Sequence, residues 1–450
     1  MKEEKDKGGY FGPVMRVTIP LWFFFLSQAL YGIFDLIFVG RFFTTSSVVA
    51  VSVGSQIVYV FTILISAVVS GMVPSLMTAL GSNDREKAER IFGTALLSSV
   101  TASAVLSIVL YLLADIILSV LSTPEAAQAE AKEYLSVALL SLPAAAAYIT
   151  TSSVESACGT SRSVTVRAAC GCGATVILSW ILGVRMNMGV LGIAYATAIS
   201  QTACAVVSVI EKFFTRKTVK LRWRNIRFNH GCVKEILSSV GPESGENIII
   251  HFSMLFITAI INARGLTAAA AAGIVEKIMT LLLTFPLTCH MTSAALCAPY
   301  FIGDRKDIRK ARDVNGMILR MVMLYGILCV LLVGGNAKTV ISLFTGDNIV
   351  IEEGRSYLSG YILEVLFGGI HYVYTGYLLA AGAKKLATET TVAAMVFIRI
   401  PLAYIASLTF PQSLLEVGLA ATAGSVLSTA VGTFIYFHLS KKKMKDLFSE

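Results

Sequence analysis

The chain has 450 residues, of which 55% are apolar and 14% are charged. A soluble domain carries about a quarter of its residues as charged side chains, so these proportions exclude an ordinary soluble protein and indicate a polytopic membrane protein. The formal net charge of +9 does not indicate a nucleic-acid partner, because the basic residues collect in particular loops. Most of the eight cysteines lie in apolar segments or basic loops, where thiols act as small hydrophobic groups, so neither a disulfide framework nor a transition-metal site is expected.

Twelve segments are predominantly apolar over about 20 residues, the length that crosses the hydrocarbon core of a bilayer. They cover residues 14–41, 47–80, 92–121, 134–157, 166–187, 190–213, 240–263, 267–300, 315–344, 356–381, 390–410 and 415–439. The sequence therefore predicts an all-α polytopic membrane protein with twelve transmembrane helices.

Most of the 37 Lys and Arg residues fall in loops that would share one side of the membrane with both termini. Basic loops stay in the cytoplasm, so both termini are predicted to be cytoplasmic and the membrane to be the cell (plasma or inner) membrane. The most basic loop, Lys212 to Lys234, joins the sixth span to the seventh. We interpret it as a solvated linker that follows this charge rule, with contact to anionic lipids as the alternative.

The two halves of the chain are related to each other. Pro20 opens the first span and Pro242 the seventh, and Gly81 and Gly303 follow the second span of each half at the same spacing. Each half has an even number of spans, so both insert the same way up, as a parallel repeat of two pseudo-symmetric six-helix lobes. The predicted domains are an N-lobe of residues 1–213, a basic linker of residues 214–236 and a C-lobe of residues 237–450. This layout suggests a transporter with a cleft between its lobes.

The first span carries one acid, Asp35, within apolar sequence. A carboxylate at membrane depth costs about 2.5–3.5 kcal/mol on insertion scales, so such a residue usually faces a bundle interior or a wet cavity. Gln28 and Tyr31 precede it by seven and four positions and therefore lie on the same helix face. These three residues form the predicted cation-coupling site. The alternative is a membrane anchor whose acid lies near the outer interface.

Polar side chains recur at spacings of three or four along the second and seventh spans. In lipid such a stripe lines a cavity or binds a neighbouring helix through hydrogen bonds, and the second explanation suffices for serine and threonine alone. The candidates for the substrate path are Gln56, Tyr59, Thr62, Asn247, Met254 and Tyr361.

Further ionisable groups lie in the seventh, eighth and tenth spans and are candidates for a second coupling or proton site. They are Glu246, His251, Glu276, Glu364 and His371. Glu364 and His371 share a helix face, which fits a proton or cation pathway, although separately satisfied groups that hold helices together would give the same pattern. Arg399, two residues before Pro401, is expected to be a packing residue that satisfies backbone groups freed by the proline.

Several short motifs occur in order along nearly the whole chain. They are Pro20 and Asp35 with Val39-Gly40-Arg41, Ala79-Leu80-Gly81-Ser82-Asn83-Asp84 with Lys87-Ala88, Gly159-Thr160-Ser161-Arg162, Gly192-Ile193-Ala194 with Ala196-Thr197, and Ile398-Arg399-Ile400-Pro401. Together with the duplicated six-helix frame, they resemble the MATE (multidrug and toxic compound extrusion) family of transporters, of the bacterial type.

The resemblance implies a V-shaped pair of lobes with a central cleft. Such a protein is not an enzyme, and it exports cationic or amphipathic small molecules by alternating access, in exchange for Na⁺ or H⁺ and with no other cofactor. We expect a monomer in the bilayer. The resemblance also implies that Asp35 is the N-lobe cation site and that Pro20 is the conformational proline at which the first helix bends.

Two departures leave the branch of the family and the coupling ion open. Where DinF-like members carry an Asn and an Asp in the fifth span, this chain has Thr175 and Ser179, so the second acid of their proton relay is missing. Where NorM-like members carry a glutamate in the seventh span, this chain has Ile250.

Two other functions are weighed against efflux. The first is a flippase for lipid-linked oligosaccharides or peptidoglycan precursors, but such proteins often have extra spans and a cationic cavity. The second, an intramembrane enzyme, is less supported, because the sequence has neither an H-E-x-x-H nor a G-x-S-x-G motif.

Overall fold

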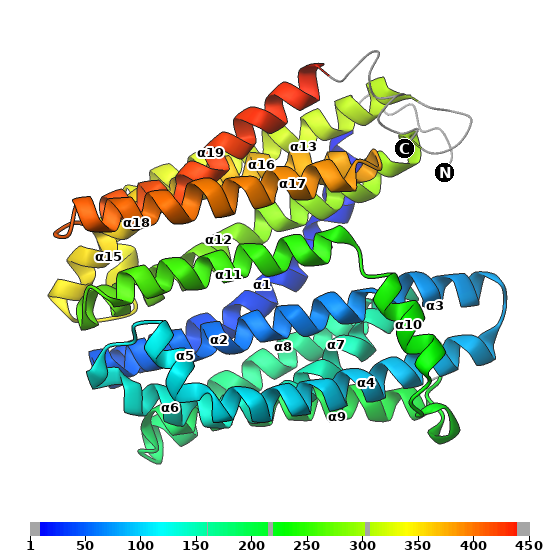
Figure 1. The fold of residues 1–450 in the computed structure, drawn as a ribbon, viewed down its shortest axis with the longest axis horizontal. Helices are drawn as coiled ribbons and strands as arrows, with labels where there is room; N and C mark the ends of the chain where they lie inside the picture. Colours follow the sequence, from blue (N-terminus) through cyan, green and yellow to red (C-terminus); the bar gives the residue numbers. More distant parts are fainter. Residues whose placement is uncertain (1–9, 160, 215–218, 302–306, 439–450) are drawn as a thin grey trace. The chain divides into compact units, whose positions relative to one another are not determined.

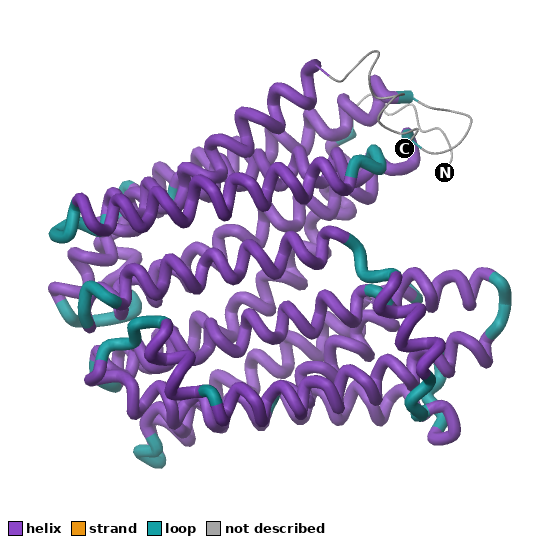
Figure 2. Tube along the Cα trace, viewed as in Figure 1, coloured by secondary structure: helices purple, strands orange, loops and turns teal. Residues whose placement is uncertain are grey.

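A computed structural model describes residues 10–159, 161–214, 219–301 and 307–438 (Figure 1). Helices joined by short loops make up this part of the chain, and it contains no strand (Figure 2). The first half contains α1 (Phe11–Phe42), α2 (Thr45–Ser70), α3 (Met72–Gly81), α4 (Arg85–Leu112), α5 (Ala114–Val120), α6 (Glu125–Leu140), α7 (Leu142–Ala157), α8 (Ser161–Leu178), the π-helical segment η1 (Ser179–Arg185) and α9 (Gly189–Phe214).

The second half begins with a short 3₁₀ turn, η2 (Trp223–Asn225), and α10 (His230–Ser238). It continues with α11 (Pro242–Asn262), α12 (Leu266–Cys297), η3 (Ala298–Tyr300), α13 (Ile308–Cys329), η4 (Val330–Gly334), α14 (Ala337–Ser342), α15 (Asn348–Tyr361), α16 (Leu363–Ala380), α17 (Lys384–Ala394), η5 (Met395–Arg399), α18 (Ile400–Thr409) and α19 (Leu415–His438).

Each of the twelve predicted spans coincides with a helical stretch. Within the described residues, nine stretches are long and apolar enough to cross a membrane, and α6 with α7, which meet at a bend of 43°, make a tenth if they form one span. α1 and α11, of 32 and 21 residues, coincide with the first and seventh predicted spans. The predicted all-α fold of a multi-pass membrane protein is confirmed.

Several helices begin earlier than predicted, and two of them start in a polar loop with a capping aspartate. The Asp84 side chain accepts a hydrogen bond from the Lys87 backbone N–H at 2.9 Å, and α4 starts at Arg85, where the sequence predicts residue 92. Asp307 accepts from the Lys310 N–H at 3.1 Å, and α13 starts at Ile308, where the sequence predicts residue 315. An apolar window misses such first turns, which are stabilised by the cap. The same cap in both halves is a further trace of the repeat.

The chain divides into two compact units, which we call the N-terminal unit and the C-terminal unit. The N-terminal unit contains Leu30–Ile274 and Phe344–Asp347, and the C-terminal unit contains Met1–Ala29, Val275–Leu343 and Asn348–Glu450. This grouping differs from the predicted lobes of residues 1–213 and 237–450, since α11 belongs to the N-terminal unit and the start of α1 to the C-terminal unit. The V-shaped arrangement of the lobes stays a prediction.

Side-chain contacts account for both differences. Within the N-terminal unit α11 packs along α2. Within the C-terminal unit, Trp22 near the start of α1 donates a hydrogen bond to Thr284 of α12 at 3.2 Å and packs edge-on against Phe285, with ring centroids 5.3 Å apart. The unit to which these terminal helices belong is therefore set by the helices that they pack against, not by their position in the chain.

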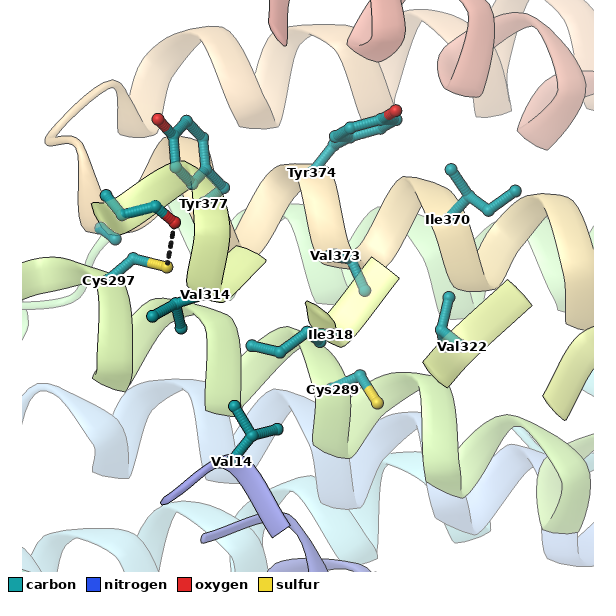
Figure 3. Packing of buried hydrophobic residues seen from close by; sticks show 12 residues of the cluster. Val14, Cys289, Cys297, Val314, Ile318, Val322, Ile370, Val373, Tyr374 and Tyr377 are labelled. Carbon is teal, nitrogen blue, oxygen red and sulfur yellow. Dashed lines mark hydrogen bonds between the residues drawn. The ribbon is translucent and has the colours of Figure 1, made fainter. Parts of the chain in front are cut away.

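The core of the C-terminal unit is apolar and includes two of the cysteines (Figure 3). Cys289 and Cys297 of α12 are fully buried beside Ile318 of α13 and Val373 of α16. The Cys297 thiol lies 3.5 Å from the carbonyl oxygen of Ala311, the only polar contact drawn in Figure 3. These thiols pack as small hydrophobic side chains, as the sequence predicts.

The connector between the two repeats is only partly the solvated linker that we expect: most of residues 219–234 are exposed, but Val219, Leu221 and Asn225 are buried. Leu221 is 1% exposed, and its backbone N–H donates to the Lys212 carbonyl at 2.9 Å. Asn225 donates from Nδ2 to Glu89 at 3.0 Å, and Thr94 donates to the Arg227 carbonyl at 3.0 Å. The charge pattern alone could not reveal these contacts, because they depend on which helix ends lie beside the connector.

Candidate functional site

The carboxylate of Asp35 lies inside the N-terminal unit and is 4% exposed. Ser179 donates a hydrogen bond to its Oδ1 at 3.0 Å, and Thr197 donates to its Oδ2 at 2.9 Å. These residues come from α1, η1 and α9. The prediction that Asp35 faces a helix-bundle interior is borne out, whereas the side chains of Gln28 and Tyr31 lie outside the described residues.

Local backbone geometry brings the two hydroxyls to this carboxylate. Ser179 begins η1, a π-helical segment, and such segments re-aim side chains at functional sites. A Cβ on Gly192 would lie 2.6 Å from the backbone nitrogen of Gly183, so only glycine lets η1 approach α9 this closely. Thr197 follows Gly192 along α9 and so reaches the same carboxylate as Ser179.

The missing second acid of the fifth span is thus replaced by hydroxyls. Ser179 bonds to Asp35 directly, while Thr175 is fully buried and donates to the carbonyl of Gly171 at 3.0 Å. One carboxylate with two hydroxyls can take up a proton, or can offer carboxylate and hydroxyl oxygens to a hard cation such as Na⁺. Within the described residues no group of three or more His, Cys, Asp and Glu side chains is arranged to hold a metal ion.

A second ionisable cluster lies in the C-terminal unit and contains two of the predicted acids. Glu364 is 5% exposed, its Oε1 accepts a hydrogen bond from Ser425 at 2.7 Å, and its buried Oε2 has no partner among the described residues. Glu276 accepts from the Tyr357 hydroxyl at 3.4 Å. Gly368 leaves room for the acid, because a Cβ there would lie 2.8 Å from Glu364 Oε1.

Arg399 belongs to this cluster, so the expectation that it mainly satisfies backbone groups is wrong. It is 1% exposed, and its Nη2 donates to the Tyr361 hydroxyl at 2.6 Å. The Tyr361 and Tyr357 rings stack with centroids 5.4 Å apart, which connects Arg399 to the phenol that contacts Glu276. Arg399 interacts electrostatically with both Glu276 and Glu364. Tyr361, a predicted substrate contact, is fully buried and orients this guanidinium.

His371 and His251 each contact residues outside the two clusters. His371 is 5% exposed, and its Nε2 lies 3.0 Å from Thr391 Oγ1 on α17. His251 packs edge-on against Tyr59, with ring centroids 5.2 Å apart. For His371 the interpretation as a separately satisfied packing group fits better than a pathway shared with Glu364. The Glu246 side chain lies outside the described residues.

The polar stripes of the second and seventh spans face each other within the N-terminal unit. Thr258 of α11 donates to Gln56 of α2 at 2.9 Å, and Ser70 and Ser244 approach within 3.2 Å. Gln56 is therefore engaged in helix packing, and Thr62 donates to the carbonyl of Val58 in its own helix at 2.8 Å. Among the substrate-path candidates, Tyr59 and Asn247 are exposed, Gln56, Thr62 and Met254 are partly exposed, and Tyr361 is buried.

A buried ion network in the N-terminal unit was missed by the sequence analysis. Glu155 of α7 is fully buried and forms ion pairs with Arg167 of α8 and with Lys212 of α9, which is 1% exposed. Arg167 also pairs with Glu211 at 2.5 Å. The sequence does contain a signal for this network: Glu155 is an acidic residue within the fourth apolar segment, just as Asp35 is within the first.

Comparison with known proteins agrees with this architecture. A family model described as MatE matches residues 20–181 and, a second time, residues 242–405. The chain is 22% identical over 393 residues to the multidrug export protein MepA of Staphylococcus aureus (strain MRSA252), with 86% of each chain covered. It is 21% identical over 400 residues to MepA of Staphylococcus haemolyticus (strain JCSC1435), with 87% of each covered. The double match confirms the predicted repeat.

Solved structures share the fold. One, described as the inward-facing conformation of a multidrug resistance MATE family transporter of the MOP superfamily, has a TM-score of 0.83 at 17% identity and covers 94% of this chain and 96% of its own. Another, described as the outward-facing conformation of such a transporter, has a TM-score of 0.75 at 17% identity and covers 99% and 98%.

Proposed function

The chain belongs to the MATE family of transporters, and from this premise we propose that it exports cationic or amphipathic small molecules in exchange for Na⁺ or H⁺. Members of this family are transporters rather than enzymes. The names of the similar MepA proteins, multidrug export proteins, support a drug-like substrate. In this proposal the protein is a monomer in the cell membrane with both termini in the cytoplasm.

The observation that carries the proposal is the burial of Asp35 between two hydroxyl donors. A buried carboxylate is costly unless it is paired, neutralised or bound to a cation. Ser179 and Thr197 stabilise its charged form, and their hydroxyls can rotate to present oxygen lone pairs when a cation enters. Asp35 can therefore be stabilised both with and without a bound proton or cation, as an ion-coupling site requires.

Coupling requires that the ion and the drug bind two conformations unequally. We propose that occupation of Asp35 favours one arrangement of α1, η1 and α9, and that drug release is linked to this arrangement. Pro20 supports such a change, because it removes one backbone hydrogen bond inside α1.

The cluster of Glu276, Glu364 and Arg399 is proposed as the second coupling site. Two carboxyl groups interact electrostatically with the Arg399 guanidinium, so a proton or Na⁺ would complete the neutralisation of this cluster. Glu364 Oε2, which has no hydrogen-bond partner within the described part of the chain, is the oxygen available to accept it. Tyr59, which is 45% exposed, offers a ring face for cation–π contact with a cationic drug.

The test is drug efflux from proteoliposomes under imposed Na⁺ or H⁺ gradients. Asp35→Asn keeps the size of the side chain and removes its charge, so we expect gradient-driven efflux of a fluorescent cationic dye to be lost. Asp115→Asn is the matched control, since that acid is exposed and pairs with Lys132, and it should transport as the unmodified protein does. Undiminished efflux by Asp35→Asn with an unchanged ion dependence would refute the proposal.

A further inference from the structure

The first part of the connector, residues 219–228, is held rigidly against the end of the N-terminal unit. Besides the contacts of Leu221 and Asn225, a Cβ on Gly93 would lie 2.1 Å from the carbonyl oxygen of Asn225. The α4 backbone and the connector backbone are therefore in direct contact. The backbone of this segment is therefore fixed by packing against α4, and its position determines where its exposed side chains lie.

Aromatic side chains on and next to this rigid segment point outward. Trp223 is 79% exposed, Phe228 is 63% exposed, and Phe214 at the end of α9 is 80% exposed. The Trp223 ring stacks on Phe213 with centroids 4.7 Å apart. It thereby prolongs the exposed apolar face of α9, which includes Val206 and Ile210. A span turns such a face toward lipid, and tryptophan is enriched where a lipid-facing surface meets water.

Basic residues flank these aromatic rings. Between positions 219 and 228 the chain has four basic residues and no acidic one, namely Lys220, Arg222, Arg224 and Arg227. Arg222 is directed toward α4 by an ion pair with Glu89 at 3.2 Å. Arg224 approaches Glu86 only at 3.9 Å, with both side chains mostly exposed, and such a pair contributes little. Lys220, Arg224 and Arg227 are therefore accessible to another anion.

We propose that residues 220–228 form a binding site for anionic phospholipids at the membrane surface beside α9. Trp223 and Phe228 enter the boundary between headgroups and acyl chains, while Lys220, Arg224 and Arg227 bind headgroup phosphates. A basic loop that only follows the positive-inside rule needs neither a rigid backbone nor exposed aromatic rings continuous with a lipid-facing helix. The proposal is independent of the transported substrate and of the coupling ion.

Fluorescence of Trp223 reports this contact directly. The chain has three tryptophans, so Trp22→Phe and Trp180→Phe leave Trp223 as the single emitter. The protein is placed in nanodiscs of phosphatidylcholine that contain brominated phosphatidylglycerol or brominated phosphatidylcholine at equal mole fraction. We expect stronger quenching by the anionic lipid, and we expect high salt to reduce the difference.

Neutralising the three accessible charges, with Lys220→Gln, Arg224→Gln and Arg227→Gln combined, should remove this preference. Each basic residue near an anionic surface contributes about fivefold in binding, so the triple variant should lose on the order of 100-fold in relative affinity. Lys384→Gln with Lys385→Gln neutralises a basic pair without neighbouring aromatic residues and should leave the preference unchanged.

Three results would overturn the proposal: equal quenching by the two lipids, an undiminished preference in the triple variant, or competition by soluble glycerol phosphate as strong as that by the lipid. If the tryptophan replacements unfold the protein, the thermal stability of the unmodified chain in the two lipids gives the same comparison. Phosphatidylglycerol should then raise the unfolding temperature more than phosphatidylcholine, and the triple variant should lose that difference.

Discussion

Replacement of Glu155 by Gln tests the buried ion network of the N-terminal unit. Glu155 is fully buried between Arg167 and Lys212, and Lys212 itself is 1% exposed. The substitution preserves side-chain volume but removes the carboxylate that pairs with the buried Lys212 ammonium. Breaking a buried ion pair from one side costs about 3–5 kcal/mol, because the remaining charge stays desolvated.

The assay is thermal unfolding of the purified protein in detergent, compared at one heating rate, since unfolding of such proteins is often irreversible. We expect Glu155→Gln to unfold several degrees below the unmodified protein. Adding Lys212→Met should recover part of the loss, because it removes the uncompensated charge and keeps an apolar side chain of similar length. Asp115→Asn is the control: it breaks an exposed ion pair with Lys132 at 2.7 Å, and such pairs contribute at most about 1 kcal/mol.

Two outcomes would refute this reasoning. The first is a Glu155→Gln variant as stable as Asp115→Asn, which would mean that the network is hydrated in solution. The second is a double variant no more stable than the single one, which would mean that the loss does not come from the buried charge of Lys212.

Three further predictions concern the contacts that shape the two units. Gly192→Ala should destabilise the protein by about 1–3 kcal/mol in thermal unfolding, because its Cβ would meet the Gly183 backbone nitrogen at 2.6 Å; Gly173→Ala, with nothing within 4 Å, should be tolerated. Arg399→Met should lower stability by about 3–5 kcal/mol and Arg399→Lys by less, since the first removes a buried positive charge that interacts with the Glu276 and Glu364 carboxyls. Asp307→Ala should lower stability at neutral pH, because the hydrogen bond from the Lys310 backbone N–H holds the pKa of Asp307 below its usual value. The contribution of this carboxylate to stability is present above the pKa of the unfolded state and is lost as the pH falls through the pKa of the folded state. A profile of stability against pH would show this loss.

Local features of the sequence predicted a large part of the fold. Apolar length marks each span regardless of its neighbours, so all twelve segments coincide with helices. Paired landmarks such as Pro20 and Pro242 revealed the repeat, and the family model matches both halves. The cost of burying a charge in lipid singled out Asp35, Glu276 and Glu364 as functional candidates, and two of these acids meet in one cluster.

The partners of those acids could not be predicted in the same way. Ser179 and Thr197 stand 144 and 162 residues from Asp35 along the chain. A hydroxyl in an apolar helix carries no sequence signal that distinguishes a site ligand from a packing residue. The difference between Gln56, which is hydrogen-bonded to α11, and Tyr59, which is exposed, likewise depends on which helix lies alongside.

The sequence by itself determined the number of spans, the duplication and the burial of Asp35, because hydrophobic length and the free energy of a charge in lipid are properties of single segments. Only the tertiary structure decided what the carboxylate contacts, that Arg399 joins Glu276 and Glu364, and that the basic connector packs against α4. These contacts depend on the close approach of two segments, for example at Gly192 and Gly183. Close approach is a property of a pair of segments and not of either one alone. The hydroxyls that surround Asp35 thus belong to the fold rather than to any one stretch of sequence.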